Sequence, residues 1–263
     1  MPNESGVEVA GVHYATADSV DAFARNITAV RARIAAAAER SGRSASEIRL
    51  LPVSKTVPEE RIRLAVQAGC RQLGENKVQE ATRKHRALAD LDVAWSIIGH
   101  LQTNKAREVA AYAAEFQALD SVRVAEALDR RLQALGRGLN VYVQVNSSAE
   151  PQKHGIRPEE LPGFLAVLPR YTSLRVRGLM TLAIFTPDTE RVRRCFTLLR
   201  MLRDRARETD PDLIGPGELS MGMSGDYEVA VEEGATVVRV GQAIFGARAT
   251  PAADYWPGAA GIG

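Results

Sequence analysis

One lysine near the start of the chain has a setting suited to covalent chemistry with a carbonyl compound. Lys55 follows the apolar run of residues 49–54 and precedes a segment that reads as a helix after Pro58. An ammonium at the end of a buried strand loses hydration, which favours the neutral amine, a nucleophile that forms an imine with an aldehyde or ketone. The alternative is that the side chain simply extends from the strand end into solvent. We therefore take Lys55 as the candidate covalent residue.

Two segments near the C-terminus have the composition of a phosphate site. They cover residues 220–226 and 239–246, and both are rich in glycine, with serine in the first. Glycine lets the backbone approach an anion closely, serine hydroxyls donate hydrogen bonds, and a helix that begins near Gln242 presents free N–H groups. An ordinary strand-to-helix turn can have the same composition. Two such segments together with an imine-forming lysine favour a phosphorylated carbonyl ligand.

Arg239 stands near the end of the otherwise apolar segment 235–240. Its side chain can point into the interior of a barrel or cap the rim as a surface arginine. If the ligand is an aromatic aldehyde phosphate, the guanidinium can donate to the pyridine nitrogen. Because arginine stays charged, it would keep that nitrogen unprotonated and weaken the ring as an electron sink.

The elements that must position these residues alternate between short strands and amphipathic helices. The expected strands are residues 48–54, 71–74, 94–98, 115–119, 139–145, 174–182, 218–220 and 236–240. The expected helices are residues 59–68, 77–88, 104–114, 122–135, 158–168, 189–208, 226–233 and 242–245, with an additional helix capped by Asp18 before the first strand. Eight strand-helix units predict a single (β/α)8 barrel, since an open doubly wound sheet has fewer strands and a glycine-rich dinucleotide turn.

In such a barrel the reacting groups lie at the C-terminal ends of the strands, so the residues that follow each strand are the candidates. They are Lys55, Glu75, Asn76, His100, Asp120, Ser121, Asn146 and Thr181, followed by the two glycine-rich segments. We expect His100, Asn146 and Met180 to line the wall of the site, and Lys153 and His154 could meet a substrate carboxylate. No carboxylate or histidine lies three or four residues from Glu75 or Asp120, so no metal site is expected.

Composition limits the classes of protein to consider. The chain has 263 residues, of which 25% are charged, and a formal net charge of +2, which leaves no electrostatic footprint for nucleic acid or an anionic membrane. Cys70 and Cys195 lack a C-x-x-C spacing, which indicates reduced thiols. The sequence shows no signal peptide and no apolar run long enough to span a bilayer. We expect a cytoplasmic protein with a flexible N-terminus (1–17), one barrel domain (18–248) and a flexible tail (249–263).

Several of these segments together resemble the pyridoxal phosphate homeostasis proteins, a family related to the N-terminal barrel domain of alanine racemase. The resemblance covers about residues 18 to 248 and lies in residues 51–56, 74–80, 98–105, 178–180, 219–224 and 238–248. It implies pyridoxal 5′-phosphate on Lys55 as an internal aldimine and Arg239 at the ring nitrogen. The other residues implied to bind the cofactor are Asn76, Ser220, Met223, Ser224, Gly241 and Gln242. Where the family usually has threonine after the glycine, this chain has Gln242, which removes one hydroxyl contact and keeps the backbone N–H.

The family resemblance implies a protein that binds, protects and delivers the cofactor and keeps amino-acid and keto-acid pools in balance, without strong turnover. Apo forms of pyridoxal phosphate enzymes are the expected acceptors, and we expect a monomer. One alternative is an amino-acid racemase. A two-base racemase needs a second acid or base, which alanine racemase takes from a tyrosine of a C-terminal β-domain. That domain is not expected in this chain, and Tyr255 lies in the expected tail. A second alternative is a cofactor-free class I aldolase that uses Lys55.

Overall fold

Eight parallel strands surround a common axis in the computed structural model, which describes residues 14–247. The strands are β1 (Arg49–Pro52), β2 (Gln72–Glu75), β3 (Ala94–Ile97), β4 (Glu115–Leu119), β5 (Leu139–Gln144), β6 (Leu174–Met180), β7 (Glu218–Ser220) and β8 (Val237–Val240). Neighbouring strands pair in the order β1-β8-β7-β6-β5-β4-β3-β2. A parallel bridge between Val53 and Gly74 joins β1 to β2 and closes the barrel. The predicted (β/α)8 fold is confirmed.

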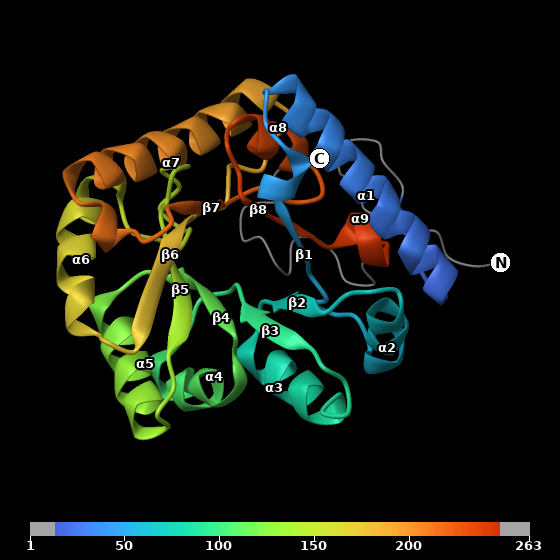
Figure 1. Cartoon of the computed structure of the whole chain (residues 1–263), viewed down its shortest axis with the longest axis horizontal. Coiled ribbons are helices and arrows are strands. Elements are labelled where there is room, and N and C mark those ends of the chain that lie inside the picture. Colours follow the sequence, from blue (N-terminus) through green and yellow to red (C-terminus); the bar gives the residue numbers. More distant parts are fainter. Residues whose placement is uncertain (1–13, 248–263) are drawn as a thin grey trace.

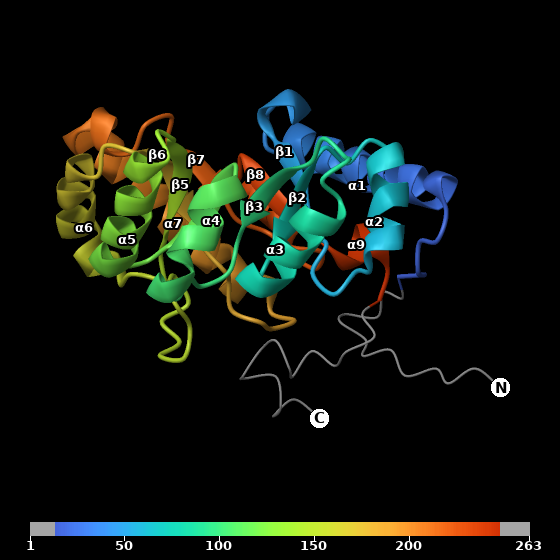
Figure 2. The same ribbon diagram turned by 90° about the horizontal axis from the view of Figure 1, so that it is seen from below.

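The helices form a layer around the outside of the strands (Figure 1). They are α1 (Val20–Arg40), α2 (Glu59–Gln67), α3 (Val78–Ala87), α4 (Ala106–Tyr112), α5 (Val122–Ala134), α6 (Leu161–Val167), α7 (Thr189–Thr209), α8 (Tyr227–Glu232) and α9 (Gln242–Phe245). Viewed from below, α3, α4 and α5 lie side by side along one flank (Figure 2). Apolar side chains between this layer and the strands make the core, as in other barrels of this class.

Several predicted boundaries need correction. Ser19, rather than Asp18, caps α1, because its hydroxyl accepts a hydrogen bond from the Ala22 N–H at 3.3 Å. The helices expected at residues 104 and 158 begin later, since short 3-10 turns occupy Thr103–Lys105 and Pro158–Glu160. The first and sixth strands end two residues earlier than expected, where the chain leaves its ladder partners.

The extra helix α1 packs against the last two helices. Phe23 meets Phe245 edge to face with ring centroids 5.4 Å apart, and Asn26 Nδ2 donates to the Ile244 carbonyl at 2.9 Å. Residues 14–17, which the sequence placed in the flexible N-terminus, also contact this region, because the Ala247 N–H donates to the Tyr14 carbonyl at 3.0 Å. The helix thereby holds α9 in place at the end of β8.

The remaining predictions about the two ends of the chain, including that for Tyr255, concern residues 1–13 and 248–263 and lie outside the described residues. Within residues 14–247, no helix combines the length and the apolar character needed to cross a membrane.

Candidate functional site

Lys55 lies, partly buried, in the turn between β1 and α2. Side chains of α3 hold the peptide groups on both sides of it. The Ser54 carbonyl accepts a hydrogen bond from Lys84 Nζ at 2.7 Å, and the Thr56 N–H donates to Glu80 Oε1 at 2.7 Å. Thr56 has φ 66°, a left-handed conformation that is costly for a β-branched residue. These two contacts stabilise a strained turn that presents Lys55 at the mouth of the barrel.

Lys84, which connects these contacts, is fully buried. Its Nζ also donates to Glu75 Oε1 at 2.8 Å and to Glu80 Oε1 at 2.7 Å, so three oxygens match the three hydrogens of the ammonium. The Ser54 hydroxyl donates to the same Glu75 oxygen at 2.6 Å. Burial raises the pKa of the Glu75 carboxyl, and the Lys84 ammonium opposes that rise. A buried ion-pair network therefore lies directly beneath the lysine turn.

Arg239 points into the barrel, where 2% of its surface is exposed. Its Nη1 donates to Ser220 Oγ at 2.7 Å, and its Nη2 donates to the Thr181 carbonyl at 2.7 Å. Burial lowers the pKa of Arg239 to about 10, and the charge of Asp226 opposes the change, so the guanidinium stays protonated at neutral pH. Of the two orientations that the sequence left open for Arg239, the structure shows the inward one, and both observed partners are uncharged oxygens.

Polar side chains continue from Arg239 down the interior of the barrel. The Ser220 hydroxyl donates to Gln117 Oε1 at 2.6 Å, and Gln117 Nε2 donates to Glu115 Oε1 at 2.5 Å. Glu115 then pairs with Arg49 at 2.8 Å near the opposite end. The Ser220 hydroxyl was expected to donate to a phosphate; in the structure its hydrogen goes to Gln117 and its oxygen accepts a hydrogen bond from Arg239.

The loop after β7 and the start of α9 lie side by side, as the sequence predicted for a phosphate site. Ser224 Oγ accepts a hydrogen bond from the Ala243 N–H at 3.4 Å, and the Tyr14 hydroxyl donates to the Ser224 carbonyl at 3.3 Å. Within the loop, the Met223 N–H donates to Asp226 Oδ1 at 2.5 Å. The Met223 N–H is therefore already hydrogen-bonded to Asp226. Ser224 and the first residue of α9 match the predicted anion contacts more closely.

The glycines of these two segments allow other parts of the chain to pack closely against them. A Cβ at Gly241 would lie 3.3 Å from the Val53 carbonyl oxygen. Gly222 has φ 94°, and a Cβ there would lie 2.6 Å from the Ala230 Cβ. Close approach to an anion was the expected reason for both glycines, and the structure shows that Val53, just after β1, and Ala230 of α8 also lie close to them. Since Val53 precedes Lys55 by two residues, the Gly241 contact brings the two predicted halves of the site together.

Asn76 and His100 follow neighbouring strands and are linked through Gly99. A Cβ at Gly99 would lie 2.1 Å from the Asn76 carbonyl oxygen and 3.0 Å from its Oδ1, so glycine is required for this contact. Asn76 is partly buried and His100 is exposed. His100 Nδ1 lies 3.0 Å from Asp120 Oδ2, a partner that the sequence did not indicate.

Met180 and Asn146, the other expected wall residues, differ in their roles. Met180 is fully buried and pairs in register with Gln144 and Ser220, so it shares their inward face of the sheet. Asn146 Nδ2 instead donates to the Glu150 carbonyl at 2.9 Å. The structure therefore supports Met180 as an interior wall, whereas the Asn146 amide organises the loop after β5.

Comparisons with known proteins bear on this arrangement. The family model for the N-terminal domain of alanine racemase matches residues 19–249. The pyridoxal phosphate homeostasis protein of Pseudomonas aeruginosa is 43% identical over 227 residues, which cover 86% of this chain and 96% of that protein. The chain belongs to the pyridoxal phosphate homeostasis protein family. The resemblance inferred from the motifs is thereby confirmed.

Solved structures related to this homeostasis-protein family share the fold. PipY of Synechococcus elongatus, solved with pyridoxal phosphate bound, superimposes with a TM-score of 0.74 at 34% identity and covers 85% of this chain and 100% of its own. Alanine racemase of Streptomyces lavendulae superimposes with a TM-score of 0.69 at 18% identity, covering 90% of this chain and 59% of its own. The racemase likeness concerns the barrel alone.

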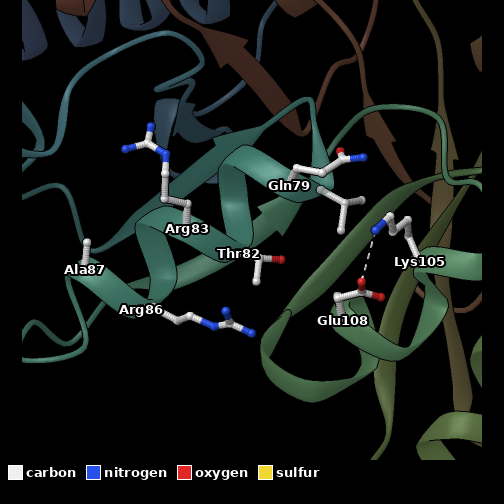
Figure 3. A pocket seen from close by; sticks show the side chains of 8 residues that line it. Gln79, Thr82, Arg83, Arg86, Ala87, Lys105 and Glu108 are labelled. Atoms are coloured by element: carbon white, nitrogen blue, oxygen red, sulfur yellow. Dashed lines mark hydrogen bonds and ion pairs between the residues drawn. The ribbon is translucent and has the colours of Figure 1, made fainter.

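A hollow of about 550 Å³ lies on the outside of this family member's barrel, between α3 and α4. Figure 3 shows Arg83 and Arg86 along one side and the Lys105–Glu108 ion pair, 3.4 Å long, along the other. Arg83 is also paired with Glu59. The hollow belongs to the helical layer and is separate from the strand ends that carry Lys55.

The pKa of Asp226 gives a prediction about this loop of the homeostasis protein. Burial raises that pKa to about 6, so the folded state binds a proton that the unfolded state releases near pH 4. The contribution of Asp226 to the stability of the folded state is complete below pH 4 and is lost as the pH rises through 6. Asp226→Asn keeps an oxygen acceptor for Met223 and cannot titrate. Urea unfolding of the variant between pH 4 and 7 should show a smaller loss of stability than the parent protein, by at most about 3 kcal/mol.

Parallel curves for the parent protein and Asp226→Asn over that range would contradict the raised pKa of the Asp226 carboxyl. Asp90→Asn is a suitable control, because Asp90 is exposed and Arg63 lowers its pKa. Asp90→Asn should change the pH dependence of stability only slightly and in the opposite direction, because the parent protein loses the contribution of Asp90 as the pH falls.

Proposed function

We propose that this chain binds pyridoxal 5′-phosphate at the mouth of its barrel and holds and supplies that cofactor. One observation carries the proposal: Lys55, the Arg239 guanidinium and the loops at Ser224 and Gly241 meet at the same end of the barrel. Val53 links them, since it lies two residues before Lys55 and against Gly241. The names of the curated relatives and the cofactor bound to PipY support the same conclusion.

The residues at the mouth fit this cofactor. Bound pyridoxal phosphate supplies a reactive aldehyde, a pyridine ring and a phosphate. Lys55 would hold the aldehyde carbon covalently, and Arg239 would donate to the ring nitrogen while Asn76 lines the ring. Ser224 and the backbone N–H of Gln242 would bind the phosphate. Ser220 contributes indirectly, because its oxygen orients Arg239.

Arg239 also supports binding rather than rapid turnover. With a pKa near 10 it remains a hydrogen-bond donor at neutral pH, so a ring nitrogen facing it stays unprotonated. An unprotonated ring stabilises a neighbouring negative charge weakly. We therefore propose slow exchange of the α-proton of an amino acid at this site, and still slower racemisation.

The proposal is tested by comparing cofactor transfer with turnover. The full chain is loaded with pyridoxal phosphate and mixed with an apo form of a pyridoxal phosphate enzyme, whose recovered activity reports transfer. The same preparation is incubated with L-alanine in deuterated water, and D-alanine is measured by chiral chromatography. We expect transfer with little racemisation. Racemisation at an ordinary enzymatic rate, tens per second, would favour the racemase alternative. Absence of any absorbing adduct with the cofactor would contradict both and favour an aldolase.

The remaining parts of the proposal concern the setting of the protein. Residues 18–248 would form the cofactor-binding domain, and the protein would act as a monomer with apo-enzymes as acceptors. We place it in the cytoplasm, since Cys70 and Cys195 are both buried and unpaired with each other. Sedimentation of the protein loaded with pyridoxal phosphate tests whether it is a monomer.

Ser224→Ala is predicted to weaken binding of pyridoxal phosphate by about tenfold, because one hydrogen bond to a charged group is worth about 1.5 kcal/mol. Binding of pyridoxal, which has the aldehyde and no phosphate, should stay nearly unchanged. Equilibrium titration followed by absorbance measures both affinities. Equal losses for the two ligands would show that this hydroxyl does not serve the phosphate.

Gln242→Thr provides a matched gain of function. Threonine restores the hydroxyl that the family usually carries at this position, while the backbone N–H of the first residue of α9 is kept. We expect tighter binding of pyridoxal phosphate and an unchanged affinity for pyridoxal. A weaker affinity for the phosphorylated ligand would place its phosphate elsewhere.

A further inference from the structure

Three metal-ligand side chains from successive strand ends meet on the rim of the barrel. His100 follows β3, Asp120 follows β4, and His154 lies in the loop after β5. His100 Nδ1 is 3.0 Å from Asp120 Oδ2, and the two imidazole rings stack with centroids 3.9 Å apart and planes 8° apart. One ligand atom of each residue lies within 4.8 Å of the others.

The loop that carries His154 is held against the barrel by its own hydrogen bonds. Gln144 Nε2 donates to the His154 carbonyl at 3.0 Å, and the Ile156 N–H donates to the Gln144 carbonyl at 2.8 Å. Gly155 has φ 123°, and a Cβ there would lie 2.7 Å from the Asn146 N. Because the loop returns onto β5 at this glycine, the His154 ring is kept beside His100 on a framework of sheet residues.

The charges around the cluster do not oppose a cation. Lys153, the residue before His154, is positively charged, and its ammonium pairs with Glu150 and donates to the Ala183 carbonyl at 2.8 Å. The Asp120 side chain is 9% exposed and supplies a negative charge beneath the two imidazoles. Both imidazoles are exposed, so a hydrated ion can reach the cluster from solvent.

We propose that His100, Asp120 and His154 form a binding site for a divalent transition-metal ion, best matched by Zn²⁺. Two imidazole nitrogens and a carboxylate oxygen are ligands that zinc accepts, with water or another ligand in the fourth position. Metal–ligand bonds of about 2.1 Å place the ligand atoms roughly 3.4 Å apart in a tetrahedral site. His100 Nδ1 and Asp120 Oδ2 are already 3.0 Å apart, and no ligand atom lies more than 4.8 Å from the others, so binding needs only small side-chain shifts that turn the imidazoles out of their parallel stack.

The proposed metal site is tested on the full chain without pyridoxal phosphate, so that the result does not depend on the proposed cofactor chemistry. The metal-free protein is titrated with Zn²⁺ by calorimetry and with Co²⁺ by visible absorbance, whose band intensity reports tetrahedral coordination. We expect one equivalent bound with a Kd of micromolar or below. His154→Ala and Asp120→Asn should each weaken binding at least tenfold while their circular dichroism stays unchanged.

His85→Ala is the matched control. His85 belongs to α3 and stacks on Tyr112 with ring centroids 4.5 Å apart, outside the cluster. Its removal should leave the metal affinity unchanged. Binding only at millimolar metal, full affinity retained in His154→Ala and Asp120→Asn, or loss in His85→Ala would each overturn the proposal.

Discussion

Replacing Lys84 with methionine is expected to destabilise the protein by about 3–5 kcal/mol, the usual cost of removing one partner from a buried ion pair. The ammonium is fully buried and bonds to Glu75, Glu80 and the Ser54 carbonyl. Methionine fills a similar volume, so most of the loss comes from two carboxylates and a carbonyl that lose their donor. Urea unfolding followed by circular dichroism measures the change.

Glu75→Gln in the Lys84→Met background should recover part of this stability, since an amide is less costly to bury than an unpaired carboxylate. Lys105→Met is the control on the surface. Lys105 pairs with Glu108 at 3.4 Å in the helical layer, and its loss should cost less than about 1 kcal/mol. A similar small cost for Lys84→Met would mean that the network beneath the Lys55 turn contributes little.

Lys55→Ala is expected to leave the protein folded and to abolish the covalent adduct with pyridoxal phosphate. Lys55 is only partly buried, and the core clusters around other side chains, so the melting temperature should change little. Binding should weaken at least about a hundredfold, or about 2.7 kcal/mol. Absorbance of the bound cofactor, followed by borohydride reduction and peptide mass spectrometry, locates the adduct in the parent protein.

Lys77→Ala is the matched control for Lys55→Ala. Lys77 lies just before α3 and is exposed, so its replacement should preserve the adduct and the affinity. An adduct that maps to Lys77, Lys84, Lys105 or Lys153 in the parent protein would refute the assignment of Lys55.

The sequence by itself determined the barrel and predicted which rim should carry the candidate cofactor site. Strand and helix periodicities are local, and eight alternations leave few ways to bury all the apolar faces, so the fold could be predicted with strand ends accurate to about two residues. Lys55, Asn76, Ser224 and Gln242 became candidates because they lie in the segments that follow strands, and the carboxyl ends of parallel strands meet at one rim. Their roles toward the cofactor were implied by the family resemblance and stay predictions.

The partners of these residues could be identified only from the tertiary structure. Gln117 and Ser220 face the barrel interior from β4 and β7, and it is strand tilt and register that place one hydroxyl between Gln117 and Arg239. Lys84 offered one overlooked signal, since it falls on the apolar face of α3 with Val78 and Ala81. A lysine on such a face must find buried acceptors.

The proposed metal site shows the limit of reasoning from sequence spacing. The expectation of no metal site rested on residues three and four apart, whereas His100, Asp120 and His154 belong to the segments that follow three different strands. Local patterns determined which residue types stand at the rim. Closure of the barrel and the turn of the loop at Gly155 decided which of these rim residues touch. Contacts between strand ends depend on distances in space, and sequence separation does not measure those distances.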